Sequence, residues 1–395
     1  MSQAQGIRVG RILGIPIYID FSWILVFGLI SIGLSGYFGS LHPAWGGTRS
    51  IAVGVGTTLL FFASVVFHEL SHSVVAQAYK IKVLSITLFI FGGLARISRE
   101  PSKAIQEFNI AIAGPLASGF LAAAFYSVTV FFPPDSMIGS LSAYLYQSNK
   151  ILAIFNLLPG FPLDGGRIFR AIVWGVSKDF MRATQAAGAS GRLIAFAMIV
   201  AGVGMVFNKD WFSSWLAPLG IAPDSLSGVW LGLIGWYLLN AAQASVAQVT
   251  IRGALAGLCA SDVMSQEVPT IPANMSLEEY SNEVLRTGRR VHIVTMGDRL
   301  VGLMNVAALN QVPRDEWNIN SVQAVMVPRD KIIWAAPEEP LQRLLERLML
   351  ADVNQMPVVS HGTDGSAHIV GIISRDAILR VIQTRSELGV ALGNR

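Results

Sequence analysis

The stretch Phe61–Lys80, FFASVVFHELSHSVVAQAYK, decides the fold of this chain. It is mostly apolar, yet it carries His68, Glu69 and His72 in an H-E-x-x-H pattern. On a helix, residues four apart share one face, so both imidazoles can reach one zinc ion while Glu69 lies beside a metal-bound water. Ionisable side chains inside an apolar helix are costly and usually mark ion pathways, metal sites or interior pairing. A polar cluster that only holds helices together is the alternative interpretation.

The composition places this stretch in a membrane protein. Of the 395 residues, 52% are hydrophobic and 14% are charged, which is too apolar for a soluble chain of this length. A membrane-spanning helix needs ~20 mostly apolar residues. We predict an α-helical polytopic protein, in contact with membrane lipid, with about six spans at roughly Phe21 to Phe38, Gly54 to Ala78, Phe108 to Phe132, Leu141 to Leu158, Leu193 to Phe207 and Gly228 to Ala247.

The basic residues predict the orientation of these spans. They gather before the first span, between the second and third, between the fourth and fifth, and after the sixth, which places them on one side. Because cytoplasmic loops are enriched in Lys and Arg, we expect both termini to be cytoplasmic in a multi-pass protein of the cell membrane. The net charge of +4 is small, so nucleic acid is not an expected partner.

The segment between the second and third spans has a different pattern. Val83–Ile97, VLSITLFIFGGLARI, is rich in β-branched and aromatic residues and is broken at Gly92-Gly93. This pattern predicts a small membrane-associated strand or hairpin. Its edge could capture an extended substrate peptide by strand addition. A structural hairpin that caps the helices is the alternative.

After residue 250 the chain becomes more polar and repeats itself. Val263-Met264 reappears as Val325-Met326, and each copy ends in a strand-like run with an interior glycine, HIVTMGDRLVGLM and HIVGIIS. We expect a membrane domain at 1–250, a linker at 251–258, and two α/β repeats at 259–315 and 320–386. The one cysteine, Cys259, excludes an intrachain disulfide framework.

A third ligand for the candidate metal comes from the segment Asn156–Gly166, NLLPGFPLDGG. A catalytic zinc needs three protein ligands and an open fourth position. The two prolines break the helix, and the glycines permit close backbone approach, so Asp164 can point toward the second span. In isolation, the same segment would be a loop with an aspartate at a helix cap.

Together these motifs resemble those of the site-2 protease family of intramembrane metalloproteases. The resemblance rests on H-E-x-x-H in the second span, on N-x-x-P-x-x-P-L-D-G-G, on Ala113-Gly114-Pro115 and on Gly92-Gly93, and it covers about Gly6 to Ala247. It implies a zinc metalloendopeptidase with one Zn²⁺ per chain. His68, His72 and Asp164 would hold the metal, Glu69 would activate water as the catalytic residue, and Asn156 would position the substrate or the oxyanion.

The resemblance also implies a partner. Substrates of this family are single-span membrane proteins, often anti-sigma factors or membrane-tethered transcription factors. A peptide bond inside a hydrogen-bonded helix is poorly exposed to attack, so we expect a substrate segment to unwind or extend before it is cut.

The repeats resemble tandem cystathionine-β-synthase (CBS) domains. Such pairs often bind adenosine nucleotides through a Ser or Thr with an Asp three residues later. Here Ser374 is followed by Ala377 at that position, with Asp376 one place early, and the first repeat has Asn305 and Ala308 instead. One expectation is that the pair senses nucleotides. The alternative is that it only packs, forms a homodimer or controls access to the membrane site.

Two other classes of protein share some of these features. A membrane transporter or channel regulated by CBS domains predicts polar residues spread through several spans, or repeated membrane halves. An inactive scaffold of the same fold predicts the loss of one site residue, whereas His68, Glu69, His72 and Asp164 are all present.

Overall fold

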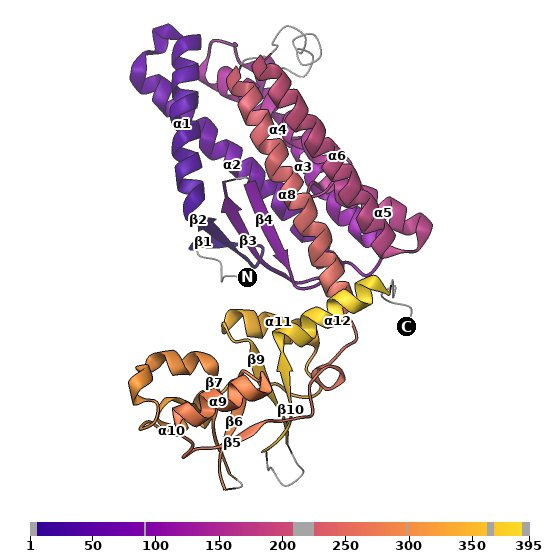
Figure 1. Cartoon of the computed structure of the whole chain (residues 1–395). Helices are drawn as coiled ribbons and strands as arrows, with labels where there is room; N and C mark the ends of the chain where they lie inside the picture. Colours follow the sequence, from indigo (N-terminus) through magenta and orange to yellow (C-terminus); the bar gives the residue numbers. More distant parts are fainter. Residues whose placement is uncertain (1–5, 91, 208–224, 298, 362–366, 389–395) are drawn as a thin grey trace. The chain divides into compact units, whose positions relative to one another are not determined.

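The computed structural model describes residues 6–90, 92–207, 225–297, 299–361 and 367–388. The chain divides into two units, Ser2–Val249 and Thr250–Arg395. The first unit is mainly helical and the second combines short helices with two small sheets (Figure 1). Each unit is described by itself.

The first unit contains the helices α1 (Phe21–Leu41), α2 (Gly46–Ala78), α3 (Ala104–Phe131), α4 (Met137–Asn156), α5 (Asp164–Ser177), α6 (Phe180–Phe207) and α8 (Ser225–Leu255). In the described part of the chain, five helical segments are long and apolar enough to cross a membrane: α1, residues 43–78 with α2, α3, α6 and most of α8. In the most apolar 18-residue stretch of α1, only 17% is buried inside the protein. The corresponding stretch of residues 43–78, which includes α2, is 44% buried. The H-E-x-x-H helix is therefore the most enclosed of these helices.

The fourth predicted span differs from the expectation. A helix does form there, as α4, but it is not among the segments that are apolar enough to cross a membrane. Its polar side chains explain the difference, because Ser140, Ser142 and Asn149 are buried inside the protein, where Oγ of Ser140 donates to the carbonyl oxygen of Pro134 and Nδ2 of Asn149 donates to Oγ of Ser64. Among the described residues, five of the six predicted spans therefore correspond to helices that are apolar enough to cross a membrane, and the fourth does not.

Glycines bring α6 and α8 close together. A Cβ atom at Gly202 of α6 would lie 2.6 Å from the backbone nitrogen of Gly232, and one at Gly235 of α8 would lie 2.8 Å from the carbonyl oxygen of Ala195. Small residues at such positions let two helical backbones approach each other in a membrane, where packing rather than the hydrophobic effect drives association.

A four-stranded sheet lies beside these helices. Its strands are β1 (Gly6–Ile12), β2 (Ile15–Asp20), β3 (Val83–Phe89) and β4 (Gly92–Ile97), in that order across the sheet. The predicted hairpin is confirmed as β3 and β4, which pair antiparallel. The prediction did not include β1 and β2, and β2 pairs parallel with β3 although 62 residues separate them. This pairing leaves β4 at an edge of the sheet.

The second unit holds the two repeats. The first repeat contains β5 (Thr270–Pro272), α9 (Leu277–Thr287), β6 (Val291–Met296) and β7 (Arg299–Asn305); the second begins with α10 (Val322–Val325) and β8 (Val327–Pro328), and β8 joins the sheet of the first. The second contains α11 (Leu341–Leu350), β9 (Gln355–His361), β10 (Ala367–Ser374) and α12 (Arg375–Glu387). Each repeat has its own core, built around Tyr280 in the first and around Leu344 and Leu348 in the second.

The segments Val263-Met264 and Val325-Met326 each pack against the repeat to which they do not belong. A Cβ atom at Gly302 of β7 would lie 2.5 Å from Sδ of Met326, and one at Gly371 of β10 would lie 2.8 Å from Sδ of Met264. Each methionine thus packs against the interior glycine of the other repeat, and Ser265 exchanges two backbone hydrogen bonds with Ile372. The two repeats therefore form one interlocked body.

Candidate metal centre

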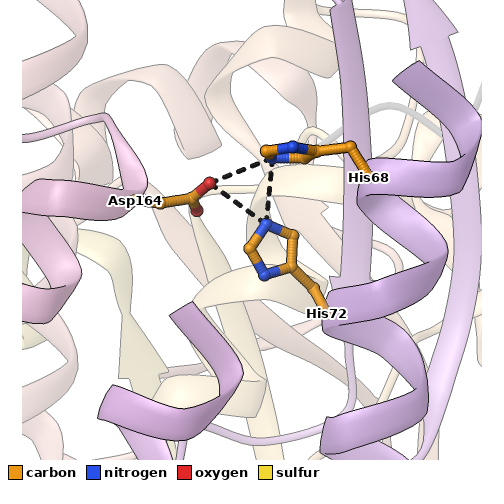
Figure 2. Close-up of side chains that lie close together, drawn as sticks. All are labelled: His68, His72 and Asp164. Atoms are coloured by element: carbon orange, nitrogen blue, oxygen red, sulfur yellow. Dashed lines mark hydrogen bonds and ion pairs between the residues drawn. The ribbon is translucent and has the colours of Figure 1, made fainter. Parts of the chain in front are cut away.

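Helix α2 presents His68 and His72 on one face, as their spacing predicts. Their Nε2 atoms are 3.2 Å apart, and each lies 3.1 Å from Oδ2 of Asp164 (Figure 2). Four ligands placed tetrahedrally at ordinary zinc distances would be separated by roughly 3.3 Å. The three atoms therefore have the mutual spacing of ligands to one zinc ion, and His68 and His72 are buried.

Hydrogen bonds on the far side of each ring orient the histidines. Nδ1 of His72 donates to the carbonyl oxygen of Ile110 at 2.6 Å, and Nδ1 of His68 lies 2.9 Å from Oγ of Ser118. Because a carbonyl oxygen only accepts, Nδ1 of His72 carries a proton, which leaves Nε2 as the nitrogen that faces His68 and Asp164. Such partners are typical of metal-binding histidines.

Helix α3 supplies these partners at intervals of four residues. Ile110, Gly114 and Ser118 share the face of α3 that looks onto the two histidines. A Cβ atom at Gly114 would lie 2.2 Å from Nε2 of His72 and 2.6 Å from Nε2 of His68. The absence of a side chain at Gly114 therefore leaves the space in which a metal ion can contact both nitrogens.

Asp164 reaches the site because the chain turns sharply between α4 and α5. Asp164 is the first residue of α5 and follows the loop Leu157–Leu163. A Cβ atom at Gly166 would lie 2.3 Å from the carbonyl carbon of Gly160, so the start of α5 packs directly onto this loop. The two glycines after Asp164 thus permit the close approach that the sequence predicted.

Glu69 lies beside the cluster, under strand β4. A Cβ atom at Gly93 would lie 2.5 Å from Cγ of Glu69, which shows how closely the strand covers this side chain. Glu69, the two histidines and Asp164 line one cavity of about 810 Å³. The carboxylate therefore faces the same space as the metal-binding atoms.

Asn156 lines the same cavity from the end of α4. Its Nδ2 donates to the carbonyl oxygen of Leu152 at 3.0 Å, which orients the side-chain amide. The structure brings together all five residues that the sequence singled out. It adds Ser118, the Ile110 carbonyl and Arg167, another residue of the cavity lining, which sequence reasoning missed. The four-residue spacing of Gly114 and Ser118 was the one sequence signal that could have indicated that Ser118 faces the site.

Fold and site together define a polytopic membrane protein that carries a candidate metal centre of two histidines and one carboxylate. The model of peptidase family M50 matches residues 56–144 and 133–200 of the chain, and the CBS domain model matches residues 322–384.

Two of the relatives match this chain over almost its whole length. The chain is 32% identical over 391 residues to "Putative zinc metalloprotease sll0528" of Synechocystis sp., with 96% of both chains covered. It is 28% identical over 385 residues to "Zinc metalloprotease MJ0392" of Methanocaldococcus jannaschii, covering 97% of this chain and 98% of that one. The solved site-2 protease from Methanocaldococcus jannaschii is 29% identical over 61% of this chain and 95% of its own, with a TM-score of 0.40. The protein belongs to peptidase family M50, the site-2 protease family.

Proposed function

We propose that this protein is a zinc metalloendopeptidase that hydrolyses peptide bonds of membrane proteins within or near the bilayer. One observation carries the proposal. Nε2 of His68, Nε2 of His72 and Oδ2 of Asp164 converge at zinc-ligand spacing beside Glu69, in a cavity of the membrane-embedded unit.

His68, His72 and Asp164 would hold the metal. A bound zinc ion would lower the pKa of a water molecule to about 7 and polarise the scissile carbonyl. The carboxylate of Glu69 is placed to accept a proton from the attacking water and to deliver it to the leaving nitrogen as the carbon–nitrogen bond breaks. Asn156 would orient the substrate carbonyl through its side-chain amide.

The substrate is proposed to be a single-span membrane protein, such as an anti-sigma factor or a membrane-tethered transcription factor. Strand β4 is an edge strand, and it covers Glu69 at Gly93. An extended segment added along β4 would therefore run beside the candidate base, and strand addition exposes the peptide bonds that a helix conceals. This supports the substrate-capture role of the hairpin over a purely structural one.

Disulfide cross-linking tests this placement. In a chain whose Cys259 is replaced by serine, Leu94→Cys on β4 should cross-link to a cysteine in the cleaved segment of the substrate. Leu84→Cys on β3 is the matched control, since both leucines are exposed, at 54% and 44%. Equal cross-linking at the two positions would argue against strand addition at β4.

We further propose that both termini and the CBS pair are cytoplasmic, and that the pair controls access to the site, with dimer formation as a second role. Adenosine nucleotide binding has less support. Ala377 replaces the usual aspartate, and Oγ of Ser374 already accepts from the backbone N–H of Ala377 at 3.1 Å at the start of α12. A nucleotide-dependent rise in the melting temperature of the full chain would establish nucleotide binding, and a nucleotide-dependent change in cleavage rate would establish the sensing role.

The central experiment compares the native protein with Glu69→Gln. Zinc is measured by elemental analysis, and cleavage of a single-span substrate is followed in liposomes. We expect about one zinc per chain in both proteins, with cleavage lowered at least about 100-fold in the variant, because removing a general base typically costs this much. Glu346→Gln, on the exposed face of α11, is the matched control and should cut at the native rate. Absence of zinc from the native protein would refute the proposal.

A further inference from the structure

A buried ion pair joins α3 to α5 next to the metal centre. Nε of Arg170 donates to Oε1 of Glu107 at 2.7 Å, and Nη2 of Arg170 bonds to the same oxygen. Glu107 is 0% exposed and Arg170 is 5% exposed. In the described part of the membrane-embedded unit, they are the only buried acidic or basic side chains besides His68 and His72.

Arg170 also contacts the chain on both sides of Asp164. Its guanidinium carbon lies 5.0 Å from the ring centre of Phe161, three residues before Asp164, and 4.7 Å from that of Phe180, at the start of α6. Cation–π contacts of this kind are stronger when they are shielded from water. One guanidinium thus ties together the loop before Asp164, the helix that Asp164 begins and the helix that follows.

Glu107 lies on the helix that orients the histidines. It is three residues before Ile110, whose carbonyl accepts from His72, and Gly114 and Ser118 follow on the same helix. The ion pair therefore connects the helix that supports His68 and His72 to the helix that carries Asp164. Stability alone is a weak explanation for it, because burying two charges costs about as much as their attraction returns.

We propose that Glu107 and Arg170 are positioning residues, which hold Asp164 at the distance from His68 and His72 that zinc binding requires. Neither residue belongs to the candidate ligands or to the cavity lining, although Oε1 of Glu107 also lies 4.0 Å from Nε of Arg167, which lines the cavity. The pair acts through the helices that it joins. This inference rests on the proposed zinc site.

Zinc affinity, measured by chelator competition, tests the inference in a form that does not depend on cleavage. Glu107→Gln leaves the Arg170 charge facing a neutral amide, and Arg170→Lys removes the planar fork that Glu107, Phe161 and Phe180 contact. Each should weaken zinc binding by about 10-fold to 100-fold, the usual effect of losing a group that orients a ligand. Glu100 lies 3.9 Å from Nη2 of Arg170 and can partly replace Glu107 as its partner. We therefore expect the loss of zinc affinity in Glu107→Gln to be about 10-fold, the lower end of this range.

A double variant separates positioning from folding. Glu107→Leu with Arg170→Met removes both charges and fills the space with apolar side chains, which often preserves or raises stability. We expect a native melting temperature, zinc binding weakened by at least about 10-fold, and an altered visible spectrum after cobalt substitution. The control is Arg182→Gln, which breaks an exposed ion pair with Asp179 at 3.2 Å and should leave zinc affinity unchanged.

The outcomes distinguish the two proposals. Native zinc affinity and a native cobalt spectrum in the double variant would overturn the positioning role, as would affinity losses that only follow losses in melting temperature across the variants. A native protein that binds no zinc would instead overturn the proposed function, whatever the variants do.

Discussion

Gly114→Ala should block the metal centre without disturbing its helix. The added Cβ would lie 2.2 Å from Nε2 of His72, whereas ordinary contacts begin near 3.4 Å, so the atoms must separate by about 3.4 − 2.2 = 1.2 Å. A displacement of about 1 Å at a reacting centre lowers the reaction rate on the order of 100-fold. At 1.4 kcal/mol for each factor of ten, this corresponds to about 2.8 kcal/mol. We therefore expect peptide cleavage to fall about 100-fold and zinc affinity to fall as well, because the added Cβ occupies space beside both Nε2 atoms.

Gly119→Ala is the matched control on the same helix, because a Cβ atom at Gly119 meets no atom within 4 Å. Both substitutions replace glycine within a helix, which by itself favours the helix by roughly 0.5–1 kcal/mol. Zinc affinity by chelator competition and the melting temperature are measured for both variants. Gly119→Ala should bind zinc as the native protein does. If Gly114→Ala also binds zinc with native affinity, the placement of α3 against the two histidines is wrong.

Two further perturbations test the orientation of His68 and the core of the first repeat. Ser118→Ala removes the hydroxyl 2.9 Å from Nδ1 of His68 and should weaken zinc binding by about 10-fold, measured by chelator competition, while the exposed Ser127→Ala should have no effect. In the second unit, burial lowers the pKa of His292 below its ordinary 6.5, against a smaller opposing effect of Glu283, and both ring nitrogens lack a hydrogen-bond partner among the described residues. The unfolded chain then binds the proton more readily, so the stability of the unit should be lost as the pH falls below about 6.5. Hydrogen exchange of the β6 amides, compared at about pH 7.5 and about pH 5, should show this loss in the native chain and a smaller one in His292→Leu; equal protection of the native chain at both values would contradict it.

The sequence predicted most of the helical architecture because the signals are local. The positions of the spans follow from apolar runs, although α6 begins at Phe180 and the fifth span was predicted to begin at Leu193. The hairpin at Val83–Ile97 follows from its β-branched residues and its glycine break. The prediction missed the β1–β2 hairpin although its turn at Leu13-Gly14 is local. The pairing of β2 with β3 could not be predicted, because no local pattern encodes such a distant partner. The polar residues of α4 are visible in the sequence, but only the packing of the helices shows that Asn149 is buried and donates to Oγ of Ser64.

By itself, the sequence determined the chemistry available at the candidate site. Helix geometry alone places His68 and His72 on one face, and the prolines and glycines around Asp164 indicate a break where a third ligand can enter. Only the tertiary structure decided how these groups meet. Gly114 makes room between the rings, Ser118 orients His68, and the pair of Glu107 and Arg170 joins the supporting helices. These contacts are made between helices, so they depend on how the helices pack, and the spacing of residues along one helix cannot specify that packing.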